Sequence, residues 1–177
     1  MRYIALLRAV NVGGCKLPMA ELREVCAELG WQQVATYIQS GNVVFEAAGP
    51  PAALETALEL AVEARFGFAR PVIVRNARQW AEYAEGSPFP DVEATTPNYL
   101  LLGLAKSPIA DGIAEKLEAR GVAGEQVRQT KDALWLWFPD GSGVSKLSPS
   151  AIDKAAGSPV TTRNWRTVCK LQEMLKG

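Results

Sequence analysis

The stretch that decides the fold is VATYIQSGNVVFE, at residues 34–46. Two β-like runs, 34–39 and 43–46, flank Ser40-Gly41-Asn42, and this combination is typical of a hairpin turn between two strands. The stretch therefore predicts two antiparallel strands joined by a tight turn.

Helices and strands are predicted on both sides of this hairpin. Upstream, residues 3–10 form a mostly apolar run, and apolar residues then recur at helical spacing over 19–29, with Gly30 suited to the end of the helix. Downstream, residues 54–66 predict a second helix and 71–75 another short strand. The resulting order, β-α-β-β-α-β, is that of the ferredoxin-like split βαβ unit.

The same order begins again in the second part of the chain. Residues 76–85 predict a short helix, and the proline-rich segment 86–97 predicts a linker. Beyond it we expect the following elements: a strand at 99–104, a helix at 109–120, a hairpin of 127–130 with 134–138, a short helix that Ser148-Pro149 starts and Gly157 closes, and a last helix at 162–175. The sequence therefore predicts an α+β fold of two ferredoxin-like β-α-β-β-α halves, 1–85 and 98–177, with an added C-terminal helix. The halves share element order, without a residue-level repeat.

The composition is that of an ordinary globular protein. Of the 177 residues, 48% are hydrophobic, which is enough for a packed core without a disulfide or metal. The apolar runs are too short to span a bilayer, and the N-terminus lacks the cleavage pattern of a signal peptide. We therefore expect a cytoplasmic protein that does not associate with membranes.

The chain contains no histidine, which excludes Ser-His and Cys-His nucleophiles and histidine-ligated metals. Its three cysteines, Cys15, Cys26 and Cys169, are odd in number and show no C-x-x-C spacing, so neither a disulfide framework nor a zinc site is expected. Catalysis would need a carboxylate, lysine, tyrosine or an unknown cofactor. No acids pair at an informative spacing, so the sequence assigns no catalytic residue.

Positive charge gathers at the two ends of a chain whose formal net charge is zero. Residues 1–20 carry three basic residues and no acid, and residues 141–177 carry six basic residues against two acids. These ends would either neutralise the acidic middle or form a local anion site. The zero net charge argues against a general nucleic-acid coat.

The first candidate site is the loop Asn11-Val12-Gly13-Gly14-Cys15-Lys16, between a strand and a helix. Paired glycines expose backbone N–H groups to an anion, and lysine adds a charge. The alternative is a tight turn with a solvated lysine, because neither the Walker A nor the G-x-G-x-x-G pattern is matched. Ser40 and Asn42 would join the site only if they faced this loop.

Further candidates lie near the C-terminus. Gly141-Ser142-Gly143-Val144-Ser145-Lys146 is either a phosphate cradle or a flexible turn. Arg163, Arg166 and Lys170 have the spacing of one helix face, and Arg163 and Asn164 are expected in the first turn of the last helix. We expect either internal pairs and caps or contacts with a bound anion.

Trp135 and Trp137 alternate in LWLWF, so they share one face of a predicted strand. Such a pair is found on RNA-binding sheets, but the RNP1 pattern is absent, and core packing is the favoured interpretation.

Four stretches carry a family resemblance: LLRAVNVGG at 6–14, YIQSGNVVF at 37–45, SKL at 145–147 and TTRNWRTVCKL at 161–171. Together with PFP at 88–90 they resemble the bacterial family of domain of unknown function 1697. Ala9, Val10 and Arg166 depart mildly from the usual pattern of that family. The resemblance implies a two-part ferredoxin-like architecture and no established activity.

Three functions follow as hypotheses. The first is a binding module for a small anionic ligand, such as a nucleotide, a phosphometabolite or a short RNA. The second is a structural or protein-interaction module, and the third an enzyme that does not use histidine. For the first, the predicted ligand-binding residues are Arg8, Asn11, Gly13, Gly14, Lys16, Ser40, Asn42, Ser145, Lys146, Arg163, Asn164 and Lys170.

Overall fold

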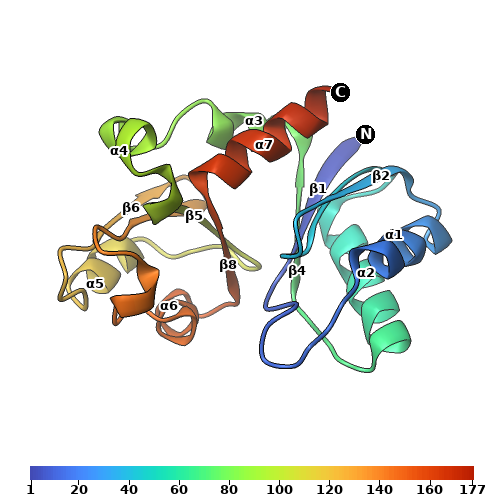
Figure 1. Ribbon diagram of the computed structural model, residues 1–177, viewed down its shortest axis with the longest axis horizontal. Coiled ribbons are helices and arrows are strands. Elements are labelled where there is room, and N and C mark those ends of the chain that lie inside the picture. Colours follow the sequence, from blue (N-terminus) through green and yellow to red (C-terminus); the bar gives the residue numbers. More distant parts are fainter. The chain divides into compact units, whose positions relative to one another are not determined.

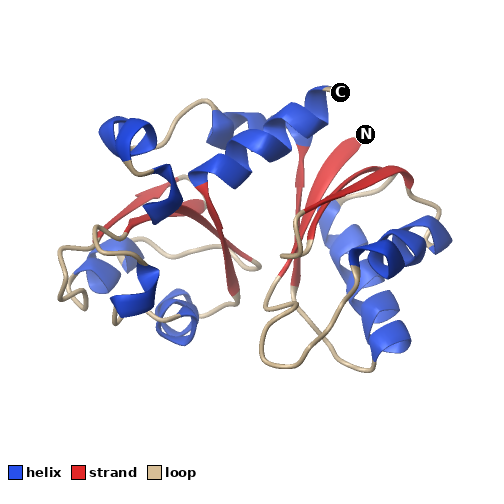
Figure 2. Cartoon of the chain, in the orientation of Figure 1, coloured by secondary structure: helices blue, strands red, loops and turns tan.

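Two four-stranded antiparallel sheets, drawn red in Figure 2, organise residues 1–177 of the computed structural model. The chain divides into one unit of residues 1–82 with 171–177 and a second unit of residues 83–170. Helices α3 (Ala77–Ala84) and α7 (Trp165–Lys176) each contribute residues to both units.

The first unit contains the elements predicted around the hairpin. They are β1 (Arg2–Leu7), α1 (Met19–Glu28), β2 (Gln32–Tyr37), β3 (Asn42–Glu46), α2 (Pro51–Phe66) and β4 (Val72–Asn76). The strand order β2-β3-β1-β4 is that of the ferredoxin-like unit, so the predicted architecture is confirmed.

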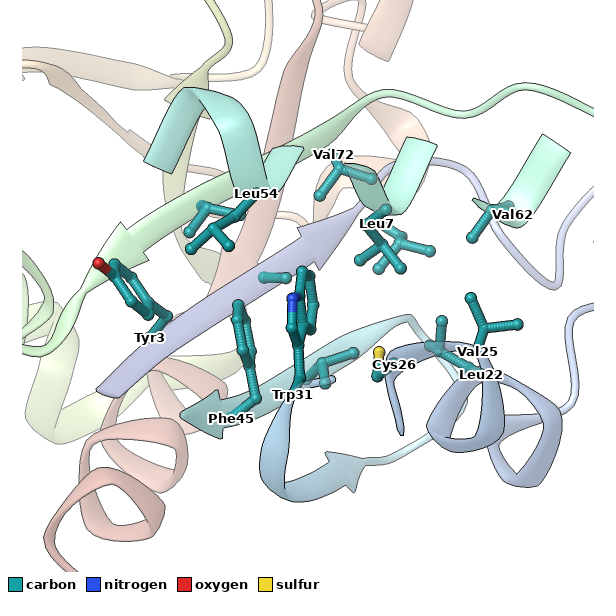
Figure 3. Close-up of a cluster of buried hydrophobic side chains, with 14 of the residues drawn as sticks. Tyr3, Leu7, Leu22, Val25, Cys26, Trp31, Phe45, Leu54, Val62 and Val72 are labelled. Carbon is teal, nitrogen blue, oxygen red and sulfur yellow. The ribbon is translucent and has the colours of Figure 1, made fainter. Parts of the chain in front are cut away.

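The core of the first unit lies where α1 and α2 cover one face of the sheet (Figures 1 and 3). Trp31 and Phe45 stack there with ring centroids 3.9 Å apart and ring planes within 9° of parallel. Cys26 is fully buried in the same cluster, and burial raises the pKa of its thiol to about 12. It therefore behaves as a small apolar residue, as its helical position predicts.

The second unit repeats this arrangement with the strand order β6-β7-β5-β8. Its elements are α4 (Pro90–Thr95), β5 (Leu100–Ala105), α5 (Ile113–Glu118), β6 (Gln126–Thr130), β7 (Ala133–Trp137), α6 (Pro149–Ala156) and β8 (Val160–Asn164), with short 3-10 helices at Pro97–Tyr99 and Ser142–Val144. Ser148 caps α6 by accepting from Ala151 N, and left-handed Gly157 ends it, as predicted.

Strand β8 is not among the elements predicted from the sequence, and the predicted placement of residues 162–164 in the last helix is wrong. The β-branched residues Val160, Thr161 and Thr162 pair with β5 instead, and α7 starts only at Trp165. Helix α5 starts four residues later than predicted, after left-handed Gly112. The segment predicted as a linker contains α4 and the first 3-10 residue.

With β8 in place, a residue-level repeat becomes visible at the end of each fourth strand. Arg75-Asn76 ends β4 and Arg163-Asn164 ends β8. Each asparagine Oδ1 accepts the N–H three residues later, capping the next helix, at 2.9 Å in both units. Each arginine Nη1 donates to the carbonyl of the preceding residue, at 3.0 and 2.8 Å. The expectation of no residue-level repeat was therefore wrong at this position.

Carboxylates from neighbouring helices accept hydrogen bonds from strands at the sheet edges. The pairs are Val72 N with Glu59 (2.8 Å), Val74 N with Glu55 (2.9 Å), Val127 N with Glu118 (2.8 Å) and Val160 N with Asp153 (2.9 Å). These bonds occupy N–H groups through which an edge would otherwise pair with another strand.

The two tryptophans of β7 pack against apolar neighbours. Trp135 is buried beside Trp165, with ring centroids 5.9 Å apart, and Trp137 lies 6.5 Å from Phe89. Core packing is confirmed for Trp135.

Candidate functional site

The ends of three strands bring the two longest resemblance stretches of the first unit together. Strand β1 pairs with β3 on one side and β4 on the other, so the loop after β1 lies beside the β2–β3 turn and the segment before β4. Leu7 N donates to Gly41 O at 2.9 Å, and Arg8 N donates to Pro71 O at 3.0 Å. Loop 8–18 is thus held from both sides.

Asn11 is the main internal support of this loop. Its Nδ2 donates to Leu17 O at 3.1 Å and to Gln39 O at 2.6 Å, and its Oδ1 accepts from Leu17 N at 2.9 Å. Its φ of 56° lies in the left-handed region, which asparagine tolerates better than most residues. These bonds occupy the Asn11 side chain with the loop itself and with the neighbouring turn.

Ser40 and Asn42 hold the β2–β3 turn. Asn42 is fully buried, and its Nδ2 donates to Tyr37 O at 3.0 Å and to Ser40 Oγ at 2.9 Å. Between them, Gly41 has a φ of 75°, and a Cβ built there would lie 2.8 Å from Val10 Cγ2. The contacts described for Ser40 and Asn42 are thus internal to the hairpin.

Arg70 is a cation beside the first loop that is not among the residues predicted from the sequence. Its Nε donates to Ala9 O at 3.1 Å, and its Nη2 contacts Cys15 Sγ. No local motif marks it. The signal lies in the topology, because the antiparallel pairing of β1 with β4 places the residues before Val72 beside those after Leu7.

Beyond these supports, the loop presents a set of free donors. The N–H groups of Val12, Gly13 and Gly14 make no hydrogen bond within the protein, and the exposed Lys16 ammonium has no partner. Gly14 and Lys16 help to line an open pocket of about 520 Å³, together with Asn11, Cys15, Pro18 and Gln39. Three adjacent amides and one cation are the chemistry that an anion accepts.

The second glycine loop differs in its charge. Ser145 Oγ donates to Glu125 Oε1 at 2.6 Å and accepts from Leu147 N at 3.0 Å. Glu125 is only 5% exposed, and the hydrogen bonds from Ser145 and then Ala123 N lower the pKa of its carboxyl below the ordinary 4.5. A carboxylate held here repels a phosphate group that would bind beside Ser145. The side chain of Lys146 is exposed and unpaired.

Replacing Ser145 with alanine is expected to lower the free energy of unfolding by about 1 kcal/mol at pH 7. Because the pKa of Glu125 is lowered in the fold, its stabilisation is present above pH 4.5 and is lost as the pH falls through the lowered value. Urea unfolding at pH 7 and pH 3 should therefore show a smaller difference from wild type at the lower pH. Ser142→Ala, which removes a hydroxyl without a partner in the same loop, is the control. A difference that does not change with pH would contradict this role of Glu125.

The C-terminal candidates do not form the predicted helix face. Arg163 and Asn164 lie in β8, and only Arg166 and Lys170 lie in α7. Burial lowers the pKa of Arg163 to about 10, and its Nη1 donates to Thr161 Oγ1 at 2.9 Å. The side chain of Asn164 caps α7 from the end of β8. Arg163 and Asn164 therefore precede the helix and do not form its first turn.

The candidate residues fall into the two units of the chain. Arg8, Asn11, Gly13, Gly14, Lys16, Ser40 and Asn42 belong to the first unit, and Ser145, Lys146, Arg163, Asn164 and Lys170 to the second. The sequence leaves open whether the first loop and the last helix share one site, and the pooled set of ligand-binding residues stays a prediction.

Comparison with solved structures finds a chain of the same fold. It is the conserved bacterial protein SP0830 from Streptococcus pneumoniae, with a TM-score of 0.72, 24% identity and coverage of 98% of each chain. No curated protein matches the sequence. The helices of this chain are all too short or too polar to cross a lipid bilayer.

The family model described as protein of unknown function (DUF1697) matches residues 1–135, about three quarters of the chain. The matched region includes the Asn11–Lys16 loop, the β2–β3 turn and the PFP stretch, which carry much of the resemblance seen in the sequence. The chain therefore belongs to the DUF1697 family.

Proposed function

We propose that this chain is a binding module for a small anionic ligand, held by the loop from Asn11 to Lys16. The observation that carries the proposal is the run of three unpaired amides, Val12 to Gly14, beside the unpaired ammonium of Lys16. Backbone N–H groups and a cation on one loop match a phosphate or carboxylate group.

The surroundings of the loop support the same chemistry. Residues 1–20 contain no acid, and Arg70 adds a second cation against Cys15. Asn11 and Gly41 fix the loop before any ligand arrives, so less conformational entropy is lost on binding. A nucleotide or phosphometabolite is the ligand class of this size and charge.

Titration calorimetry with ADP and with inorganic phosphate tests the proposal. Lys16→Gln is expected to weaken binding by about five- to tenfold, through loss of one charge-assisted contact. Lys146→Gln is the matched control, because it removes a lysine of the other glycine loop that is also exposed and unpaired. If both variants weakened the affinity for ADP and phosphate equally, the anions would be attracted by the overall charge and not by this loop. If the wild-type chain bound neither probe, the proposal would be wrong.

A structural or protein-interaction module is the second candidate function. It is favoured by one observation. Four of the predicted ligand-binding residues form hydrogen bonds within the protein through their side chains: Asn11, Asn42, Ser145 and Asn164. Such a module would fold normally and show no heat of binding with either probe.

A further inference from the structure

The second unit contains a pocket that is lined by none of the predicted ligand-binding residues. It has a volume of about 130 Å³ and is more enclosed than the open pocket of the first loop. Its lining is Leu101, Phe138, Ser142, Leu147, Pro149, Ile152, Val160 and Thr162, all of which belong to the second unit.

The walls of this pocket are apolar and firmly held. Phe138, Leu147, Ile152 and Val160 are each less than 5% exposed and belong to the core cluster of the unit. The loop that carries Leu147 is tied down by the bond between Ser145 and Glu125. The space is therefore bounded by well-packed residues on several sides.

Two hydroxyl groups provide the polar part of the lining. Thr162 is half-buried on β8, and its hydroxyl makes no hydrogen bond within the protein. Ser142 is exposed, and its hydroxyl is likewise unpaired. Ser142 and Pro149 are exposed, whereas Val160 and Phe138 are buried, so the lining includes both surface and core residues.

We infer that this pocket binds a small neutral molecule or group with an apolar ring or branched chain of about six carbon atoms and one hydroxyl. The size follows from the volume, because an apolar cavity of about 150 Å³ stays dry and takes up benzene. The hydroxyl follows from the two unpaired partners in the lining. The nearby Glu125 carboxylate disfavours an anion, so this site differs in chemistry from the first loop.

The inference is tested by NMR titration of the full chain with benzene and with phenol, following the methyl signals of the core. Shifts are expected at Leu101, Ile152 and Val160, and phenol should bind about three- to tenfold more tightly than benzene because of its hydroxyl. Absence of shifts at these methyl groups at the solubility limit of both probes would overturn the inference.

Two substitutions at one position separate volume from polarity. Thr162→Val keeps the size and the strand preference but removes the hydroxyl, so it should reduce or abolish the preference for phenol and leave benzene binding intact. Thr162→Ile replaces the hydroxyl with an ethyl group, which is one carbon larger than the valine variant, and should weaken benzene binding at least tenfold. Unchanged benzene affinity in Thr162→Ile would also overturn the inference, and the wild-type titration decides the matter if that variant fails to fold.

Discussion

Replacing Gly41 with alanine is expected to lower the free energy of unfolding by about 3 kcal/mol. The new Cβ would lie 2.8 Å from Val10 Cγ2 and 2.9 Å from Leu7 Cβ, because Gly41 is buried, and its φ is 75°. Strain at positive φ costs about 1 kcal/mol or more, and overpacking costs about 1–3 kcal/mol. Urea unfolding followed by circular dichroism measures the loss.

Gly13→Ala is the matched control for this prediction. Gly13 also has a positive φ, of 60°, but no atom lies within 4 Å of a Cβ built there. It should lose only about 1 kcal/mol, from backbone strain alone. If the two variants lost the same amount, the close approach of the turn to β1 would not be a source of stability.

Asn11→Gly is expected to lower the free energy of unfolding by about 2 kcal/mol. Glycine accepts the left-handed backbone but removes the three hydrogen bonds to Leu17 and Gln39. The loop should also exchange its amide hydrogens faster, which mass spectrometry of the 11–17 segment measures.

Gln39→Ala serves as the control for Asn11, because Asn11 bonds only the backbone carbonyl of Gln39. The alanine variant should unfold within about 0.5 kcal/mol of wild type. A full loss of stability in Gln39→Ala, or none in Asn11→Gly, would contradict the role assigned to Asn11.

Most elements of the fold could be predicted because local signals agreed with the tertiary structure. The hairpin signal around Gly41 and the capping residues Ser148 and Gly157 all lie where the sequence places them. Strand β8 was missed because Arg163, Arg166 and Lys170 have the spacing of one helix face, which extended the predicted last helix backwards over residues that pair with β5.

The candidate site could be predicted only in part. The glycine pair and Lys16 stand out in the sequence, but the support from Gly41 and Arg70 depends on which strands neighbour β1. The role of Ser145 was ambiguous for a similar reason, since its partner Glu125 lies twenty residues away, in the loop before β6. Contacts between distant segments follow from strand order, which local patterns do not state.

The two glycine loops have neighbours of opposite charge, so they are expected to bind different ligands. The first loop has Lys16 free and Arg70 beside it, whereas the second holds the Glu125 carboxylate against Ser145. Similar sequence patterns, glycines followed by a lysine, therefore lead to different chemistry once their neighbours are known.

The most direct test of the anion site is a titration of the ¹⁵N-labelled chain with inorganic phosphate, read at backbone amides. The proposal predicts saturable shifts of the Val12, Gly13 and Gly14 amides, which weaken as salt is added, while the amides of Gly141 and Gly143 stay in place. Equal shifts in both loops, or none at Gly13 and Gly14, would contradict it.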